Sequence, residues 1–299
     1  MTLVTASPDR VVRLVILTLL AALAPMIWGS TYIVTTEILP EGRPLMAAAL
    51  RTLPAGLLLL IGFGAWRLPV SLWRILVLSL INISGFQALL FLAAYRLPGG
   101  QAALLGAISP VLILALNWMA GAGRPRWTQI ALALCGLAGM GLLVFTPGLG
   151  WDPIGVIAAL AGTSLFAIGI LLTRSWGRNA PLFALTGWQL TLGGAVLLPA
   201  ALAFEPALPA LSHREIGGYL YLCLAGGLAG YVFWFTGLTR LPPVAMAALG
   251  LLSPVTATLL GWALLGQSLP PLGLVGMLII LVSVFALQVL ASPQKGQSS

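Results

Sequence analysis

A seventeen-residue stretch occurs twice in this chain, first as YRLPGGQAALLGAISPV at residues 95–111 and again as TRLPPVAMAALGLLSPV at residues 239–255. Nine of the seventeen positions are identical at a constant offset of 144 residues, and they begin with Arg-Leu-Pro and end with Ser-Pro-Val. In a chain of 299 residues, an offset of this size predicts an internal duplication with one copy in each half. We therefore divide the chain into residues 1–147 and 148–299.

The composition predicts an integral membrane protein. Sixty per cent of the residues are hydrophobic and only 7% are charged, whereas about a quarter of a soluble globular protein is charged. The apolar runs are each long enough to cross a hydrocarbon core of about 30 Å as a helix.

Charges, prolines and glycines separate ten apolar segments. The segments lie at about 11–36, 44–65, 72–95, 99–120, 127–146, 153–174, 181–203, 216–238, 242–265 and 269–290. In lipid the backbone can form only helices or closed barrels, and continuous apolar runs lack the alternation of barrel strands. The expected fold is an all-α polytopic membrane protein with ten transmembrane helices.

The basic residues indicate the orientation of these helices. With the N-terminus inside, ten Lys and Arg residues fall in inner segments and three in outer loops, and one more, Arg51, lies within a span. The inner residues are Arg10, Arg13, Arg67, Arg74, Arg124, Arg126, Arg174, Arg178, Arg240 and Lys295, and the outer ones are Arg43, Arg96 and Arg214. This distribution follows the positive-inside rule and predicts cytoplasmic N- and C-termini in a cell inner membrane. It also explains the net charge of +8 without a nucleic-acid partner.

Each half contains five spans, and this odd number inverts the second copy relative to the first. Arg96 then lies in an outer loop, while its repeat partner Arg240 lies in an inner loop. Many secondary transporters are built from inverted repeats, which let one central site face each side in turn. We therefore expect an alternating-access carrier.

The same residues carry a resemblance to a known family. Trp28-Gly29-Ser30, Arg51, and Arg-Leu-Pro followed by Ser-Pro-Val in both halves resemble the drug/metabolite transporter superfamily in its ten-helix, EamA-type form. Within it the chain is most similar to the bacterial amino-acid exporters, including the aromatic amino-acid branch. The resemblance implies export of amino acids, with drug or other small-metabolite efflux as the alternative.

Two glycine–proline pairs are candidate hinges. Pro110 and Pro254 lie within the fourth and ninth spans and cannot donate a hydrogen bond to the carbonyls of Gly106 and Gly250. The exposed carbonyls could serve a substrate, and the bends could move during transport. The alternative is that the prolines only shape the bundle.

Polar and aromatic side chains inside the spans are candidates for the cavity lining, because polar groups in lipid tend to face a cavity. At the offset of 144, Gln87 corresponds to Tyr231 and Leu90 to Trp234. The candidate substrate-binding residues are Trp28, Asn82, Gln87, Phe166, Trp188, Tyr231 and Trp234. The alternatives are hydrogen bonds between helices for the polar residues, and core or lipid contacts for the aromatic ones.

Two charged residues have ambiguous roles. Arg51 lies within snorkelling reach of the outer interface, so we expect a structural role, with pairing to a substrate carboxylate as the alternative. Glu37 is the acidic residue nearest to the membrane interior. Since no carboxylate lies clearly at mid-membrane, we expect facilitated export, and proton antiport through Glu37 is second.

The remaining residues exclude several classes of activity. The only lysine is Lys295, so no phosphate-binding loop with its lysine exists. The single histidine, His213, lies in a loop, and Cys135 and Cys223 are far apart, so we expect neither a metal site nor a cofactor. We expect a small-molecule substrate, the lipid bilayer as surroundings and function as a monomer. A membrane-embedded lipid-modifying enzyme is the alternative from a different class, but it would need a buried acid–base pair that the sequence does not offer.

Overall fold

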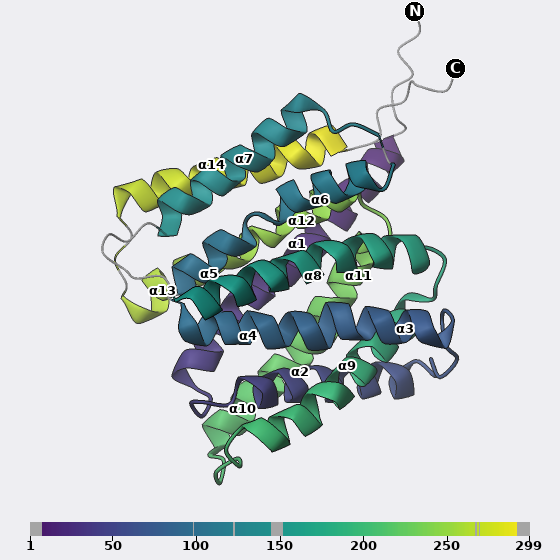
Figure 1. Ribbon diagram of the computed structural model, residues 1–299, viewed down its shortest axis with the longest axis vertical. Coiled ribbons are helices and arrows are strands. Elements are labelled where there is room, and N and C mark those ends of the chain that lie inside the picture. Colours follow the sequence, from purple (N-terminus) through teal and green to yellow (C-terminus); the bar gives the residue numbers. More distant parts are fainter. Residues whose placement is uncertain are drawn as a thin grey trace, which may run out of the picture.

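The structure is a computed structural model that describes residues 8–97, 99–121, 123–144, 152–266, 268 and 270–291. Within these ranges every regular element is helical (Figure 1). The predicted boundary between the halves at 147/148 and the predicted cytoplasmic tail lie outside the described residues.

The two halves contain the same series of elements. The first half contains α1 (Pro8–Glu37), α2 (Pro44–Gly62), α3 (Leu72–Ser79), the π-helix η1 (Leu80–Gly85), α4 (Phe86–Arg96), α5 (Gly99–Gly106), α6 (Ser109–Met119) and α7 (Trp127–Val144). The second contains α8 (Pro153–Trp176), α9 (Leu182–Phe204), α10 (His213–Tyr221), the π-helix η2 (Leu222–Ala229), α11 (Gly230–Leu238), α12 (Pro243–Gly250), α13 (Leu252–Leu265) and α14 (Pro271–Ala291). The correspondence confirms the predicted duplication, element by element.

These elements form the ten predicted spans. In the described chain, nine helical segments are long and apolar enough to cross a membrane, and the tenth, α7, is a shorter apolar helix over Trp127–Leu143. The third span of each half is continuous through its π-helix, and the fourth is divided into two helices. The all-α polytopic fold is therefore confirmed.

The halves interlock around a pseudo-two-fold axis. At opposite edges of the bundle, α2 packs against its repeat partner α9, and α7 packs against its partner α14 (Figure 1). Between these edges α1 packs on α11 and α13, and α8 makes the matching contacts with α4, α5 and α6. The first span of each half is thus enclosed by the third and fourth spans of the other half.

A pair of glycines brings α7 and α14 close together. A Cβ added to Gly139 would lie 2.8 Å from the carbonyl oxygen of Gly276, and one added to Gly276 would lie 2.4 Å from that of Gly139. Both distances are shorter than real Cβ contacts, so only glycine permits this crossing. Such small-residue interfaces drive helix association in lipid, where the hydrophobic effect between helices is absent.

The contacts of α8 place the two repeated arginines at opposite ends of the bundle. Arg96 lies 3.4 Å from the carboxylate of Asp152, which caps the first turn of α8. In the last turn of α8, Arg174 donates a hydrogen bond to the carbonyl of Leu241, the neighbour of Arg240. Since α8 has 24 residues and is about 36 Å long, Arg96 and Arg240 are separated by the length of a membrane-spanning helix. This separation agrees with inverted halves.

Candidate functional site

A cavity of about 910 Å³ lies between the two halves. Its walls come from the first, third and fourth spans of both halves, together with α2. These are the elements that the pseudo-two-fold packing brings to the middle of the bundle, so the position of the cavity follows from the fold. The inverted-repeat architecture predicts a substrate site in this position.

The cavity is open at one end and closed at the other. Its lining includes Thr36, Glu41 and Gly42, which are exposed at the turn between α1 and α2. The deepest lining residues include Ile170 and Phe235, each 1% exposed. One turn further on, α8 is joined to the connection between α11 and α12 by the hydrogen bond from Arg174 to Leu241 described above. The cavity therefore opens on the face that carries Arg96.

Gln87 and Tyr231 meet at the centre of the molecule. The Gln87 Nε2 donates a hydrogen bond of 2.6 Å to the Tyr231 hydroxyl, and the two residues are 144 positions apart. A residue that touches its own repeat partner must lie near the axis that relates the two halves. Five further repeat pairs line the cavity with them, namely Leu90/Trp234, Phe91/Phe235, Gly106/Gly250, Ala107/Leu251 and Ser109/Ser253.

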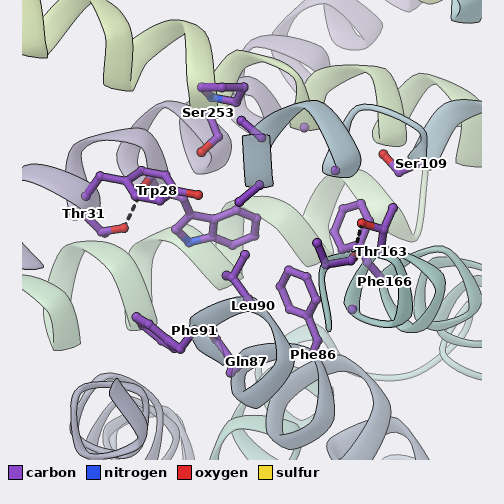
Figure 2. A pocket seen from close by; sticks show the side chains of 18 of the residues that line it. Trp28, Thr31, Phe86, Gln87, Leu90, Phe91, Ser109, Thr163, Phe166 and Ser253 are labelled. Carbon is purple, nitrogen blue, oxygen red and sulfur yellow. Dashed lines mark hydrogen bonds between the residues drawn. The ribbon is translucent and has the colours of Figure 1, made fainter. Parts of the chain in front are cut away.

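Aromatic rings from both halves form a continuous series along the wall. The ring centroids of Phe86 and Phe166 are 5.4 Å apart, those of Phe166 and Trp234 5.6 Å, and those of Trp234 and Trp28 5.3 Å. The series continues from Trp28 to Tyr231 at 5.2 Å. Figure 2 shows Trp28, Phe86 and Phe166 directed into the same space. Rings at these separations attract each other beyond the area they bury, so the wall is apolar, continuous and stiff.

The structure brings six of the seven candidate binding residues to this cavity. They are Trp28, Asn82, Gln87, Phe166, Tyr231 and Trp234. Asn82 also donates hydrogen bonds to Thr173 at 2.8 Å and to Gln189 at 2.7 Å. Its side chain therefore also links the third span to α8 and α9. Hydrogen bonding between helices was the alternative expected for the polar residues.

The cavity-facing position expected for Trp188 is wrong. Its indole packs against a separate cluster formed by Ile75, Leu78 and Leu185, near α3. Consecutive residues on a helix point about 100° apart, and in α9 it is the neighbouring Gln189 that turns toward Asn82. The depth of Trp188 in the span was predictable from the sequence, but the rotation of its helix was not.

The π-helix η1 puts Asn82 and Gln87 on the same side of the third span. Residues five apart point in nearly opposite directions on an α-helix, but π-helical i→i+5 hydrogen bonding aligns them. Shifted by 144 residues, η1 falls within η2, so both third spans carry the same irregularity in the same place. π-bulges are frequent at functional sites.

The fourth span of each half is interrupted at its glycine–proline pair. In the first half α5 ends at Gly106 and α6 begins at Ser109; in the second α12 ends at Gly250 and α13 begins at Leu252. Both glycines line the cavity, and a Cβ on Gly106 would meet nothing within 4 Å. The interruptions agree with the predicted bends at Pro110 and Pro254, and their movement during transport stays a prediction.

Arg51 does not extend to the outer interface that lies within its reach, and its structural role stays a prediction. Its side chain is 5% exposed and points inward to the cavity wall, where the guanidinium carbon lies 5.8 Å from the ring centroids of both Trp28 and Tyr231. Phe86 also lines the cavity and was not among the predicted residues. Its spacing of four from Asn82 and from Leu90 places it on the same helix face and could have indicated this position.

Acidic and metal-binding groups are sparse around the cavity. Glu37 is exposed at the end of α1 and accepts a hydrogen bond from Thr36. Among the lining residues that the structure describes, Glu41 at the mouth is the acidic one. Within the described ranges no three His, Cys, Asp or Glu side chains gather in a way that could hold a metal ion.

In the described part of the chain, ten spans in two interlocked halves around a central cavity define a polytopic membrane protein with the architecture of a secondary transporter. The profile of the EamA-like transporter family matches this chain twice, over residues 15–145 and 153–288. The chain therefore belongs to the EamA-like transporter family and is a membrane transporter. The alternative of a membrane-embedded enzyme is accordingly set aside.

Similar proteins have been described in several bacteria. Protein PecM of Dickeya dadantii is 41% identical over 268 residues, which cover 89% of this chain and 90% of PecM. The inner membrane transporter YedA of Escherichia coli, an uncharacterized protein, is 28% identical over 87% of this chain and 88% of its own length. A probable terminal-alkyne amino-acid exporter of Streptantibioticus cattleyicolor is 29% identical over 65% of this chain and 66% of its own length.

A solved crystal structure shares the fold. It superposes with a TM-score of 0.80, covers 92% of this chain and 97% of its own, and is 21% identical in sequence. The ten-helix arrangement is therefore one that an experimentally determined protein adopts.

Proposed function

We propose that this chain exports amino acids, including hydrophobic and aromatic ones, from the cytoplasm by alternating access through the central cavity. The observation that carries the proposal is the continuous aromatic wall that runs past the axis contact between Gln87 and Tyr231. Apolar and aromatic side chains gain free energy by packing on such rings, and an ammonium group gains about 0.5–2 kcal/mol over their faces. The similarity to a probable amino-acid exporter supports the same class of substrate.

The orientation of the chain in the membrane is part of the proposal. The excess of basic residues on one side supports cytoplasmic termini in a cell inner membrane. With that orientation the mouth at the turn between α1 and α2 faces outward, and the contact of Arg174 with Leu241 closes the inner side. The other state would exchange these roles between the halves.

Facilitated export by a monomer agrees best with the lining. One chain supplies every wall of the cavity, so a second copy is not needed to complete it. Glu41, the acidic lining residue, lies at the mouth rather than at the centre, which supports a carrier driven by the substrate gradient. Flux of substrate should therefore be insensitive to an imposed pH gradient.

Efflux of a drug or another small metabolite is the second candidate. The cavity volume of about 910 Å³ lies near the upper end of ordinary ligand pockets, which extend to about 1,000 Å³. This volume would accommodate a molecule larger than an amino acid.

Uptake and counterflow in liposomes separate the two candidates. Full-length protein would be reconstituted and offered a panel of labelled amino acids, sugars and organic cations. We expect saturable flux of aromatic amino acids; if no amino acid moves but another compound does, metabolite efflux is the better description.

Two tryptophan variants provide a matched comparison for the site. Trp234→Ala removes a ring from the cavity wall, whereas Trp188→Ala removes the same side chain from the cluster near α3. Loss of a transition-state contact worth about 1.4 kcal/mol would lower flux about tenfold, and only Trp234→Ala should show it. Equal flux in both variants would contradict the proposal that the aromatic wall binds the substrate.

A further inference from the structure

A buried cation without a carboxylate partner lies in the wall of the cavity. The Arg51 guanidinium has five N–H donors, yet its recorded hydrogen bond is a long one of 3.4 Å from Nη2 to the carbonyl of Gly226. Its buried Nε has no hydrogen-bond partner. The single ion pair in the described part of the chain joins Arg96 and Asp152, so no protein carboxylate neutralises Arg51.

The surroundings of Arg51 hold the guanidinium in place without neutralising it. Its carbon lies 5.8 Å from each of the rings of Trp28 and Tyr231. Trp28 is itself fixed, since its Nε1 donates a 2.9 Å hydrogen bond to Gly226. A Cβ on Gly226 would lie 3.3 Å from the Arg51 Nε, which is tighter than most real contacts. The absence of a side chain at this position therefore keeps space for the guanidinium.

A second incomplete polar group, the side-chain amide of Gln87, contacts the Tyr231 hydroxyl. Gln87 is 1% exposed, and while its Nε2 donates to the Tyr231 hydroxyl, its buried Oε1 has no hydrogen-bond partner. A buried polar atom without a partner costs free energy. The cavity therefore presents a free cationic donor at Arg51 and a free acceptor at Gln87, and both residues line it.

We infer that Arg51 is the anion-binding residue of this cavity and that it takes the carboxylate of the transported molecule. A carboxylate matches the guanidinium geometry and can accept two parallel hydrogen bonds from it. The apolar part of the molecule then packs on the aromatic wall, and Gln87 Oε1 accepts a hydrogen bond from a donor group of the ligand. The inference rests on the proposed function, because it assigns a binding residue to the carboxylate of the amino acid, which the aromatic wall does not recognise.

A structural role for Arg51 makes a different prediction. If the guanidinium only tied α2 to η2 through Gly226, its removal would affect folding but not the choice between ligands. A carboxylate-binding role changes that choice, so the decisive measurement compares an acid with its neutral isostere.

The test measures binding of 3-phenylpropionate and of 3-phenylpropanamide to the full-length protein in detergent or nanodiscs, by isothermal titration calorimetry. We expect the acid to bind at least about tenfold more tightly than the amide, as for a charge-assisted pair. Arg51→Gln should bring the ratio of the two affinities to about one, and Arg51→Lys should leave an intermediate ratio. Arg43→Gln changes a half-buried arginine at the N-cap of the same helix and should keep the full ratio.

The inference is overturned if wild-type protein binds acid and amide equally, if it binds neither, or if Arg51→Gln keeps the ratio. Should Arg51→Gln fail to fold, the wild-type ratio and Arg51→Lys still decide. Flux of phenylalanine in liposomes from the same preparation separates this result from the proposed function. Flux of phenylalanine without a preference for the acid would contradict the Arg51 site but not the proposed exporter. A preference for the acid without flux would contradict the proposed exporter but not the anion site.

Discussion

The hydrogen bond between Gln87 and Tyr231 predicts a measurable coupling between the two halves of the chain. Tyr231→Phe removes the hydroxyl that accepts from Gln87 Nε2 at 2.6 Å. Because Gln87 is 1% exposed and its Oε1 already lacks a partner, the whole amide is then left buried and unpaired. Such a group costs about 1–3 kcal/mol, so we expect Tyr231→Phe to lower the free energy of unfolding by at least about 1 kcal/mol.

The double variant isolates the contribution of the pair. Gln87→Leu alone removes the donor and should also destabilise the protein by about 1 kcal/mol. Gln87→Leu combined with Tyr231→Phe removes both partners, so it should cost less than the sum of the single changes. We expect a coupling energy of about 0.6–1.7 kcal/mol, the range found for hydrogen bonds between membrane helices.

Unfolding of the purified protein by SDS in mixed micelles, followed by circular dichroism, gives the four free energies of this cycle. Tyr32→Phe serves as the control, because Tyr32 also lines the cavity but is 37% exposed. It should change the free energy of unfolding by less than about 0.5 kcal/mol. Additive single and double variants would refute the axis contact and with it the meeting of the two third spans.

Four further substitutions have expected outcomes. Pro110→Ala and Pro254→Ala should each restore a helical N–H and slow flux in liposomes; wild-type rates from both would remove the hinge. Arg51→Met should leave the ligand-free protein as stable as wild type or more stable by about 1 kcal/mol in the SDS assay, because it removes an unneutralised buried charge, whereas a loss of stability would point to a structural arginine. Gly56→Ala should destabilise the crossing of α2 and α9 by about 1–3 kcal/mol, since its Cβ would lie 2.4 Å from the backbone nitrogen of Thr191; unchanged stability would contradict that packing.

Hydropathy and charge were sufficient to predict the spans of this chain. The expected 72–95 and 181–203 compare with Leu72–Arg96 across α3, η1 and α4, and with Leu182–Phe204 in α9. The repeated stretch was sufficient to predict the duplication. Both signals depend on the lipid environment, which constrains every span in the same way.

The rotation of each helix about its own axis was not encoded in those signals. In a mostly apolar span the cavity face and the lipid face have similar compositions, so Trp188 and Trp234 look equivalent in sequence. Arg51 shows the same limit: its depth allowed the side chain to reach the interface, but the glycine at 226 and the rings of Trp28 and Tyr231 hold it inward. Gln87 and Tyr231 were predictable because the constant offset linked them across the axis.

The opposed insertion of the two halves can be measured through the repeated arginines. Arg96 and Arg240 are both exposed, and each would be replaced by cysteine in a chain that lacks Cys135 and Cys223. A membrane-impermeant thiol reagent applied to intact cells and to inverted vesicles would report the face of each position. The inverted repeat predicts labelling of one position only from outside and of the other only from inside; labelling of both from the same face would contradict it.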